Sequence, residues 1–248
     1  MAASSGMELQ SPPTAPPRRI APLWHTVVLI LVLLLFSFAG AKAGHPVQKS
    51  SGLVAQYVSM IVIEWLAFLY VVWGLRKGGV LTIREVIGGR WEKVEDFLLE
   101  IGIAAAFWIV AVMVLGGVAY ALGMAKGGAN LEQTKKLLGF LVPHTNLEIA
   151  LWICVALTAG FCEEFIFRGY VQRQFSVMSG KVFVGMLVSS IVFGMAHGYE
   201  GWKRMILICV YGFLFSALVE LRKSLRPGMM AHAWHDAFTG LVMRALFK

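Results

Sequence analysis

Two carboxylates and an arginine lie within an apolar stretch of the sequence, in the segment GFCEEFIFRGY at residues 160–170. Glu164 and Arg168 are four residues apart with the acid first, the spacing at which a carboxylate and a guanidinium meet on one face of a helix. Glu163 lies about 100° further around the same helix, so it cannot share that geometry and needs another partner. A desolvated carboxylate without a close cation holds a proton more readily, as a general base requires. We therefore predict that Glu163 is available for proton transfer.

Imidazole groups follow in two later apolar segments. His197 ends the stretch FGMAH, and AHAWHD contains His232 and Asp236 at helical spacing, with His235 flanking them about 60° from His232. A carboxylate, two imidazoles and a further carboxyl group brought to one point can bind and activate water. Because a peptide carbonyl is a poor electrophile, its hydrolysis needs an activated water and donors directed at the developing oxyanion. The pattern predicts a hydrolytic site built from three helices.

These residues form three motifs in order along the chain. EEFIFR fits EExxxR, FGMAH fits FxxxH, and HAWHD fits HxxxN with Asp in the last place. Over roughly residues 147–240 the chain resembles the CAAX prenyl protease and bacteriocin-processing family of intramembrane proteases, the CPBP or ABI family. The resemblance implies a catalytic role for each pair of residues. Glu163 and His197 hold the attacking water, and His232 and Asp236 form the oxyanion site. Glu164 and Arg168 brace the first motif.

The third motif departs from the family pattern at Asp236. An Asn amide donates a hydrogen bond to an oxyanion, whereas an ionised Asp cannot. Asp236 must then be protonated, orient His232 or bind something else. The family has been described both as metal-dependent and as using a glutamate-activated water without metal, so the cofactor is either none or a single divalent metal such as zinc. The sequence lacks an HExxH pair, yet Glu163, His197 and His232 can form a three-ligand metal site with an open fourth position.

The elements that must position these groups are membrane helices. Of the 248 residues, 58% are hydrophobic and 15% charged, which excludes an ordinary water-soluble domain. We predict an all-α, polytopic transmembrane bundle with N-terminal helices over 21–124 and a catalytic core over 147–247. Apolar runs long enough to cross a bilayer fall at about 22–40, 53–75, 99–124, 147–174, 182–199, 203–222 and 227–247.

Segments outside these runs carry further predictions. Residues 1–20, with SPPTAPPRR, are expected to form a disordered cytoplasmic tail. The first run resembles a signal peptide as well as an anchor, and its length favours an uncleaved anchor. Residues 82–98 alternate charged and apolar side chains, as in an interfacial amphipathic element. The distribution of basic residues predicts a multi-pass protein of the cell membrane with a cytoplasmic N-terminus.

Several other groups are assigned structural roles. The net charge of +8 is scattered in small groups rather than gathered in one stripe, which argues against nucleic acid. Glu64 is interpreted as a packing hydrogen-bond group, and Glu220 as a partner of Arg222, Lys223 or the interface. The cysteines are interpreted as small buried hydrophobes because they lie in apolar segments without metal-type spacing; they are Cys154, Cys162 and Cys209.

The function predicted is an intramembrane endopeptidase that acts on a membrane-associated peptide or protein, lipidated or not. The resemblance implies CAAX-type C-terminal processing or processing of bacteriocin-like peptides. The alternative is a non-catalytic membrane protein for peptide binding or self-immunity. A small transporter is disfavoured because the sequence shows no internal repeat, and the sequence contains neither a GxSG nor a GxGD protease motif.

Overall fold

Helices make up all the regular secondary structure of the described residues, which contain no strand. The computed structural model describes residues 19–43, 52–79, 81–124, 132, 134–136 and 138–247. The all-α class predicted from the composition is therefore confirmed. Residues 1–18 of the predicted tail lie outside the described part of the chain.

Seven long helical segments lie where the apolar runs predict them. They are α1 (Leu23–Ala43), α2 (Leu53–Gly78), α4 (Val94–Ala121), α6 (Asn146–Glu163) continued by η3 (Glu164–Gln172) and α7 (Arg173–Ser179), α8 (Val182–Ala196), α9 (Trp202–Arg222) and α10 (Arg226–Leu246).

Five of these segments are long and apolar enough to cross a membrane, as judged over the described residues. Helix α8 is apolar but has only 15 residues, and the more polar α10 is not among the five. A bundle of about seven spans therefore fits the helices, with α8 packed against α9 and α10 packed against α6 and α4.

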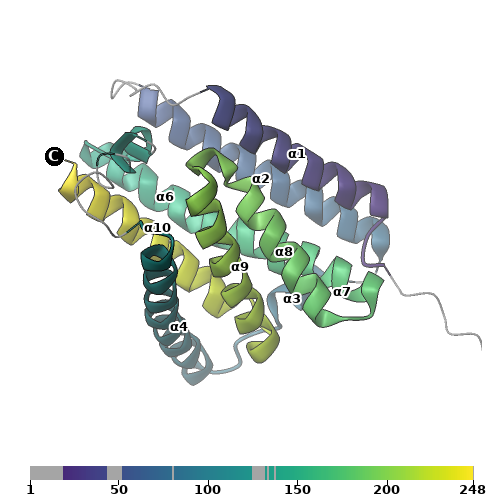
Figure 1. The fold of residues 1–248 in the computed structure, drawn as a ribbon. Helices are drawn as coiled ribbons and strands as arrows, with labels where there is room; N and C mark the ends of the chain where they lie inside the picture. Colours follow the sequence, from purple (N-terminus) through teal and green to yellow (C-terminus); the bar gives the residue numbers. More distant parts are fainter. Residues whose placement is uncertain are drawn as a thin grey trace, which may run out of the picture.

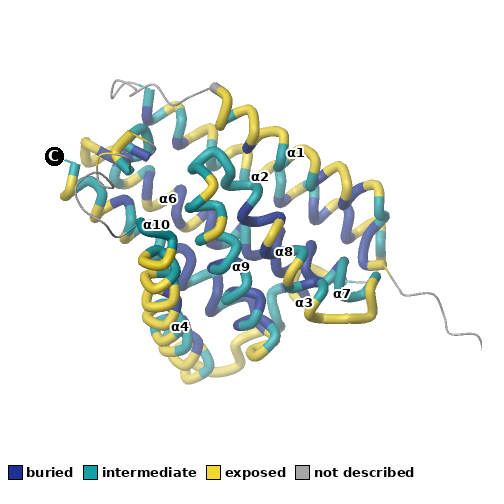
Figure 2. The backbone as a smooth tube through the Cα atoms, in the orientation of Figure 1, coloured by how far each residue is buried: buried dark blue, intermediate teal, exposed yellow. Residues whose placement is uncertain are grey.

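The core of the bundle lies around α6 and its continuation η3 (Figure 1). Helix α6 packs against α2 on one side and α10 on the other, α8 packs against α9, and α4 packs against α9 and α10. Buried residues face this centre, whereas the outward faces of α1 and α4 are exposed (Figure 2). Those outward faces carry large apolar side chains such as Phe36 and Met113, as lipid-facing surfaces do.

Glycine allows the close packing of α6 on α10. A Cβ atom at Gly160 would lie 2.7 Å from the Met229 carbonyl oxygen and 2.8 Å from the Ala233 nitrogen. Because real Cβ atoms do not approach backbone this closely, any larger residue must push the two helices apart. The packing at Gly160 sets the distance between Glu163 and the side chains of α10.

The segment predicted to be interfacial, 82–98, contains α3 (Ile83–Ile87), a loop and the first residues of α4. Hydrogen bonds from the Thr82 backbone N–H and hydroxyl lower the pKa of the Glu85 carboxyl. Glu100 of α4 connects the loop to the start of α10, because it accepts hydrogen bonds from the Trp91 indole and the Ser224 hydroxyl. Its placement at a membrane interface remains a prediction.

Two side-chain predictions have different outcomes. Glu220 forms an ion pair with Lys223 and accepts a hydrogen bond from Gln172, as expected for a paired carboxylate. Cys162 is buried, but Cys154 is exposed, so the prediction of a buried thiol is wrong there. The apolar run around Cys154 faces outward as well as inward, and apolarity alone does not distinguish a lipid-facing position from a buried one.

Candidate active site

The two adjacent glutamates lie at a change of helix type. Glu163 is the last residue of α6, and Glu164 is the first residue of η3, which is a π-helix. π-Helical turns are rare and occur frequently at functional sites. Every residue of η3 is buried, so this wider turn lies in the middle of the bundle. The Glu163 side chain reaches a cavity, whereas the Glu164 side chain is fully buried behind it.

Glu164 and Arg168 form the ion pair that their spacing predicts. Arg168 NH1 lies 3.0 Å from Glu164 Oε1, and both side chains are completely buried. The guanidinium carbon lies 4.3 Å from the ring centre of Phe193 and 5.1 Å from that of Phe215. Aromatic rings and a carboxylate together offset the desolvation of this cation.

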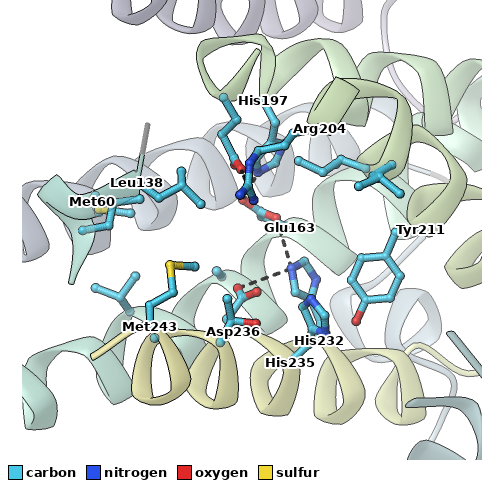
Figure 3. A pocket seen from close by; sticks show the side chains of 18 of the residues that line it. Met60, Leu138, Glu163, His197, Arg204, Tyr211, His232, His235, Asp236 and Met243 are labelled. Atoms are coloured by element: carbon cyan, nitrogen blue, oxygen red, sulfur yellow. Dashed lines mark ion pairs between the residues drawn. The ribbon is translucent and has the colours of Figure 1, made fainter. Parts of the chain in front are cut away.

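His232 of α10 joins both glutamates. Its Nδ1 lies 3.0 Å from Glu164 Oε1. Its Nε2 lies 3.5 Å from Glu163 Oε2 and 3.6 Å from Asp236 Oδ2 (Figure 3). Because Glu164 accepts a hydrogen bond from Arg168 as a carboxylate, it also accepts one from Nδ1–H of His232. That bond fixes the ring and turns Nε2 toward the cavity.

His197 follows the last residue of α8 and faces Glu163 from the other side (Figure 3). Its Nδ1 lies 2.9 Å from the Phe193 carbonyl oxygen, and its Nε2 lies 3.9 Å from Glu163 Oε1. A carbonyl oxygen can only accept a hydrogen bond, so Nδ1 carries the proton. In the neutral ring Nε2 is then a hydrogen-bond acceptor that faces the carboxylate.

These groups share one cavity of about 430 Å³, lined by residues from α2, α4, α6, α9 and α10. The cavity contains Glu163, His197, His232 and Asp236, and His235 lines it beside them. The structure therefore brings together the four groups that the sequence predicts around the reacting atoms. Glu164 and Arg168 are not among the lining residues and lie behind His232.

The structure adds Glu64 to the residues of the cavity. Glu64 lies in α2, where the sequence predicts a packing hydrogen-bond group, and it lines the same cavity as Glu163. The only sequence signal was a carboxylate in the middle of an apolar run. Which face of α2 meets α6 depends on packing that the sequence of α2 does not contain.

Metal ligation was left open by the sequence. Among the described residues, no group of three or more His, Cys, Asp and Glu side chains could hold a metal ion. His197 Nε2 lies 3.9 Å from Glu163 Oε1, and His232 Nε2 lies 3.5 Å from Glu163 Oε2. The side chains as they lie do not converge on one point at ligand distance.

In a comparison with protein families, residues 145–238 match type II CAAX prenyl endopeptidases, described as Rce1-like. The matched segment begins at Thr145, whose side chain caps α6, and it extends into α10 as far as Phe238. It contains all three motifs, and the resemblance to the CPBP family is confirmed.

The Rce1-like match indicates a protease of the CAAX type in a multi-pass membrane protein. Comparisons with curated proteins and with solved structures gave no match.

Proposed function

We propose that this protein is an intramembrane endopeptidase in which Glu163 and His197 activate water to hydrolyse a peptide bond of a membrane-associated protein or peptide. The observation that carries the proposal is the 3.9 Å separation of two acceptor atoms, Glu163 Oε1 and His197 Nε2, inside a cavity that the Rce1-like segment lines in part. This distance is too long for a direct hydrogen bond.

One water molecule fits between these acceptors. If the water oxygen lies about 2.8 Å from each acceptor, the acceptor–oxygen–acceptor angle is about 90°, near the angle between the two O–H bonds of water. Both hydrogens of the water are then held by acceptors, and a lone pair is left free to attack. The hydrogen bond from His197 to Phe193 preserves the acceptor state of Nε2.

His232 and Asp236 face the position where the carbonyl oxygen would lie. Their Nε2 and Oδ2 atoms are 3.6 Å apart, so an oxyanion fits between them as a common acceptor. His232 donates there when its ring carries a proton on both nitrogens, because Nδ1–H is already used by Glu164. The same separation leaves no direct bond by which Asp236 could orient His232, which favours a protonated Asp236 as the second donor.

The reaction then proceeds in two steps. Water adds to the carbonyl carbon, its proton moves to Glu163, and the carbonyl oxygen becomes an oxyanion held by His232 and Asp236. The oxyanion then re-forms the carbonyl, the C–N bond breaks, and the proton on Glu163 moves to the leaving nitrogen. The products are an amine and a carboxylic acid, which then releases its proton to solvent or to the amine. Glu164 and Arg168 hold the His232 ring in place throughout.

The substrate class follows from the family and from the walls of the cavity. The family description names CAAX prenyl endopeptidases, which supports cleavage near the C-terminus of a lipidated protein. Apolar side chains such as Met60, Leu138 and Met243 line the cavity beyond the polar groups (Figure 3). Processing of bacteriocin-like peptides uses the same chemistry on a non-lipidated chain. We propose that this cavity binds the substrate, which is a peptide or protein associated with the membrane.

Substitution of the general base tests the proposal. Glu163→Gln keeps the shape of the side chain but cannot take a proton, so hydrolysis should fall by about 10²–10⁴-fold. The purified variant is assayed in proteoliposomes against a peptide panel that includes farnesylated and non-lipidated C-terminal sequences, with cleavage detected by mass spectrometry. Glu95→Gln, at an exposed position of α4, is the matched control and should retain parental activity.

Two results would contradict the proposal. If Glu163→Gln cleaves a substrate at the parental rate, Glu163 is not the base. If the wild-type protein binds peptides of the panel but cleaves none of them, the non-catalytic alternative of peptide binding or self-immunity is favoured.

A further inference from the structure

One cation of the cavity has no part in the proposed reaction. Arg204 lies in α9, and its side chain reaches into the cavity from the side of His197 (Figure 3). Among the described residues that line the cavity, Arg204 is the only arginine or lysine. Four carboxyl side chains line the same cavity, namely Glu64, Glu163, Glu200 and Asp236. A substrate anion that enters the cavity therefore has one permanently cationic side chain to bind.

The guanidinium of Arg204 has donors to spare. Its NH2 lies 3.1 Å from the Thr134 hydroxyl, to which it donates a hydrogen bond. Its NH1 lies 4.0 Å from Glu200 Oε2, which is too long for a hydrogen bond. The Arg204 side chain is 22% exposed, whereas Arg168 is completely buried against Glu164. Because a guanidinium has five N–H donors in one plane, Arg204 can still bind a carboxylate through two of them.

The position of Arg204 along α9 relates it to the reacting groups. One face of α9 lines the cavity through Arg204, Leu207, Ile208 and Tyr211. The ring centre of Tyr211 lies 6.1 Å from that of His232. Arg204 and Tyr211 are separated by about 10 Å along the helix axis, at a rise of about 1.5 Å per residue. Since an extended peptide covers about 3.3 Å per residue, an anionic group bound at Arg204 would lie a few residues from the peptide bond beside His232.

We propose that Arg204 determines specificity by binding the free α-carboxylate at the C-terminus of the substrate. This inference rests on the proposed function and narrows its substrate class to chains with an unblocked C-terminus close to the cleaved bond. The α-carboxylate is ionised at neutral pH, and its transfer into a largely apolar cavity is unfavourable without a cation. A lipid phosphate is the other common anion at a membrane, but basic clusters bind it, and this cavity offers one basic residue among those described.

Two forms of one peptide test the role of the charge. They share a sequence from the panel and end either in a carboxylate or in a carboxamide, and both are assayed in proteoliposomes. Because the amide cannot form the charged hydrogen-bonded pair, kcat/KM of wild type should be about 10–100-fold lower for the amide peptide. Arg204→Gln should lower kcat/KM for the carboxylate peptide by the same factor and leave the amide peptide nearly unchanged. The variant should therefore cleave both peptides equally.

Lys203→Gln is the matched control. It removes the same charge from the next residue of α9, whose ammonium lies 5.7 Å from the ring centre of Trp202 and which does not line the cavity. This control should retain the wild-type preference for the carboxylate peptide. Arg204→Lys keeps the charge but lacks the planar pair of donors, so it should retain only part of the preference. If thermal unfolding in detergent shows that Arg204→Gln is not folded, a full wild-type preference in Arg204→Lys would overturn the proposal.

Two other results would overturn the proposal. One is equal cleavage of the two peptides by wild type. The other is a loss in folded Arg204→Gln that is the same for both peptides, as a structural role or a lipid headgroup at Arg204 would produce.

Binding measurements distinguish this inference from the proposed function. Fluorescence anisotropy with the two labelled peptides measures affinity without hydrolysis. If wild type cleaves no peptide but binds the carboxylate form more tightly, and Arg204→Gln removes that difference, the carboxylate site stands and the hydrolytic function fails. If wild type cleaves both forms equally, the hydrolytic function stands and the carboxylate site fails. Neither cleavage nor preferential binding would overturn both.

Discussion

Asp236 is the position at which this chain departs from the HxxxN pattern, and replacing it with Asn is the most informative perturbation. Asp236 Oδ2 lies 3.6 Å from His232 Nε2, so both atoms can reach one oxyanion at about 2.8 Å. As a carboxylate, Asp236 would repel that oxyanion and has no hydrogen to donate. As an acid it donates one hydrogen bond, which an Asn amide of nearly the same shape donates at any pH.

The expected effects follow from the value of one oxyanion donor. Removing such a donor costs about 10²–10³ in kcat, so Asp236→Ala should lose activity by this amount. Asp236→Asn should retain activity at low pH and keep it as pH rises. Wild-type activity should instead fall about tenfold per pH unit above the point where Asp236 loses its proton. Two units above that point, the Asn variant should be about 100-fold more active than wild type.

The assay is the pH dependence of kcat for wild type, Asp236→Asn and Asp236→Ala in the same proteoliposomes, with the substrate selected from the peptide panel. Thermal unfolding in detergent shows whether each variant is folded. The reasoning is refuted if Asp236→Asn is no more active than Asp236→Ala, or if its activity declines at high pH in parallel with wild type. Either result would mean that Asp236 acts as a carboxylate.

Two further predictions concern the support of the site. Glu164→Gln leaves the fully buried Arg168 without its counter-charge and should lower the free energy of unfolding by about 3–5 kcal/mol. Adding Arg168→Met should recover most of that loss, as measured by thermal unfolding. An unchanged unfolding temperature of the single variant would contradict this prediction. Gly160→Ala should separate α6 from α10 and lower kcat at least tenfold. The control is Gly102→Ala, where a Cβ meets nothing within 4 Å, and it should change neither kcat nor stability. Equal effects of the two changes would exclude the packing argument.

Local features of the site were predictable from the sequence because they depend on residues close together in the chain. The pairing of Glu164 with Arg168 follows from their spacing, and the structure shows it at 3.0 Å. The location of the long helices follows from the length of the apolar runs, and α9 is observed at Trp202–Arg222 against a prediction of 203–222. The motifs also identified His197 and His232, since each lies within a short pattern.

Features that depend on contact between helices were not predictable in the same way. The position of Glu64 in the cavity was not predictable because the packing of Trp65 and Phe68 on Phe161 decides which side of α2 meets the cavity. The π-helical turn at Glu164 was missed because hydrophobic spacing does not distinguish it from an α-helix in so short a segment. The exposure of Cys154 was missed because lipid-facing and buried residues are equally apolar.

The sequence by itself determined which segments are helices in a membrane and which charged residues must be explained, because burying a charge in an apolar medium is unfavourable wherever the helix lies. Only the tertiary structure decided which of those charges face one another. The distances from Glu163 to His197 and His232, and the position of Glu64 in the same cavity, arise from three different helix interfaces. Side-chain packing at those interfaces sets the register and separation of the helices, and no single helix contains that information.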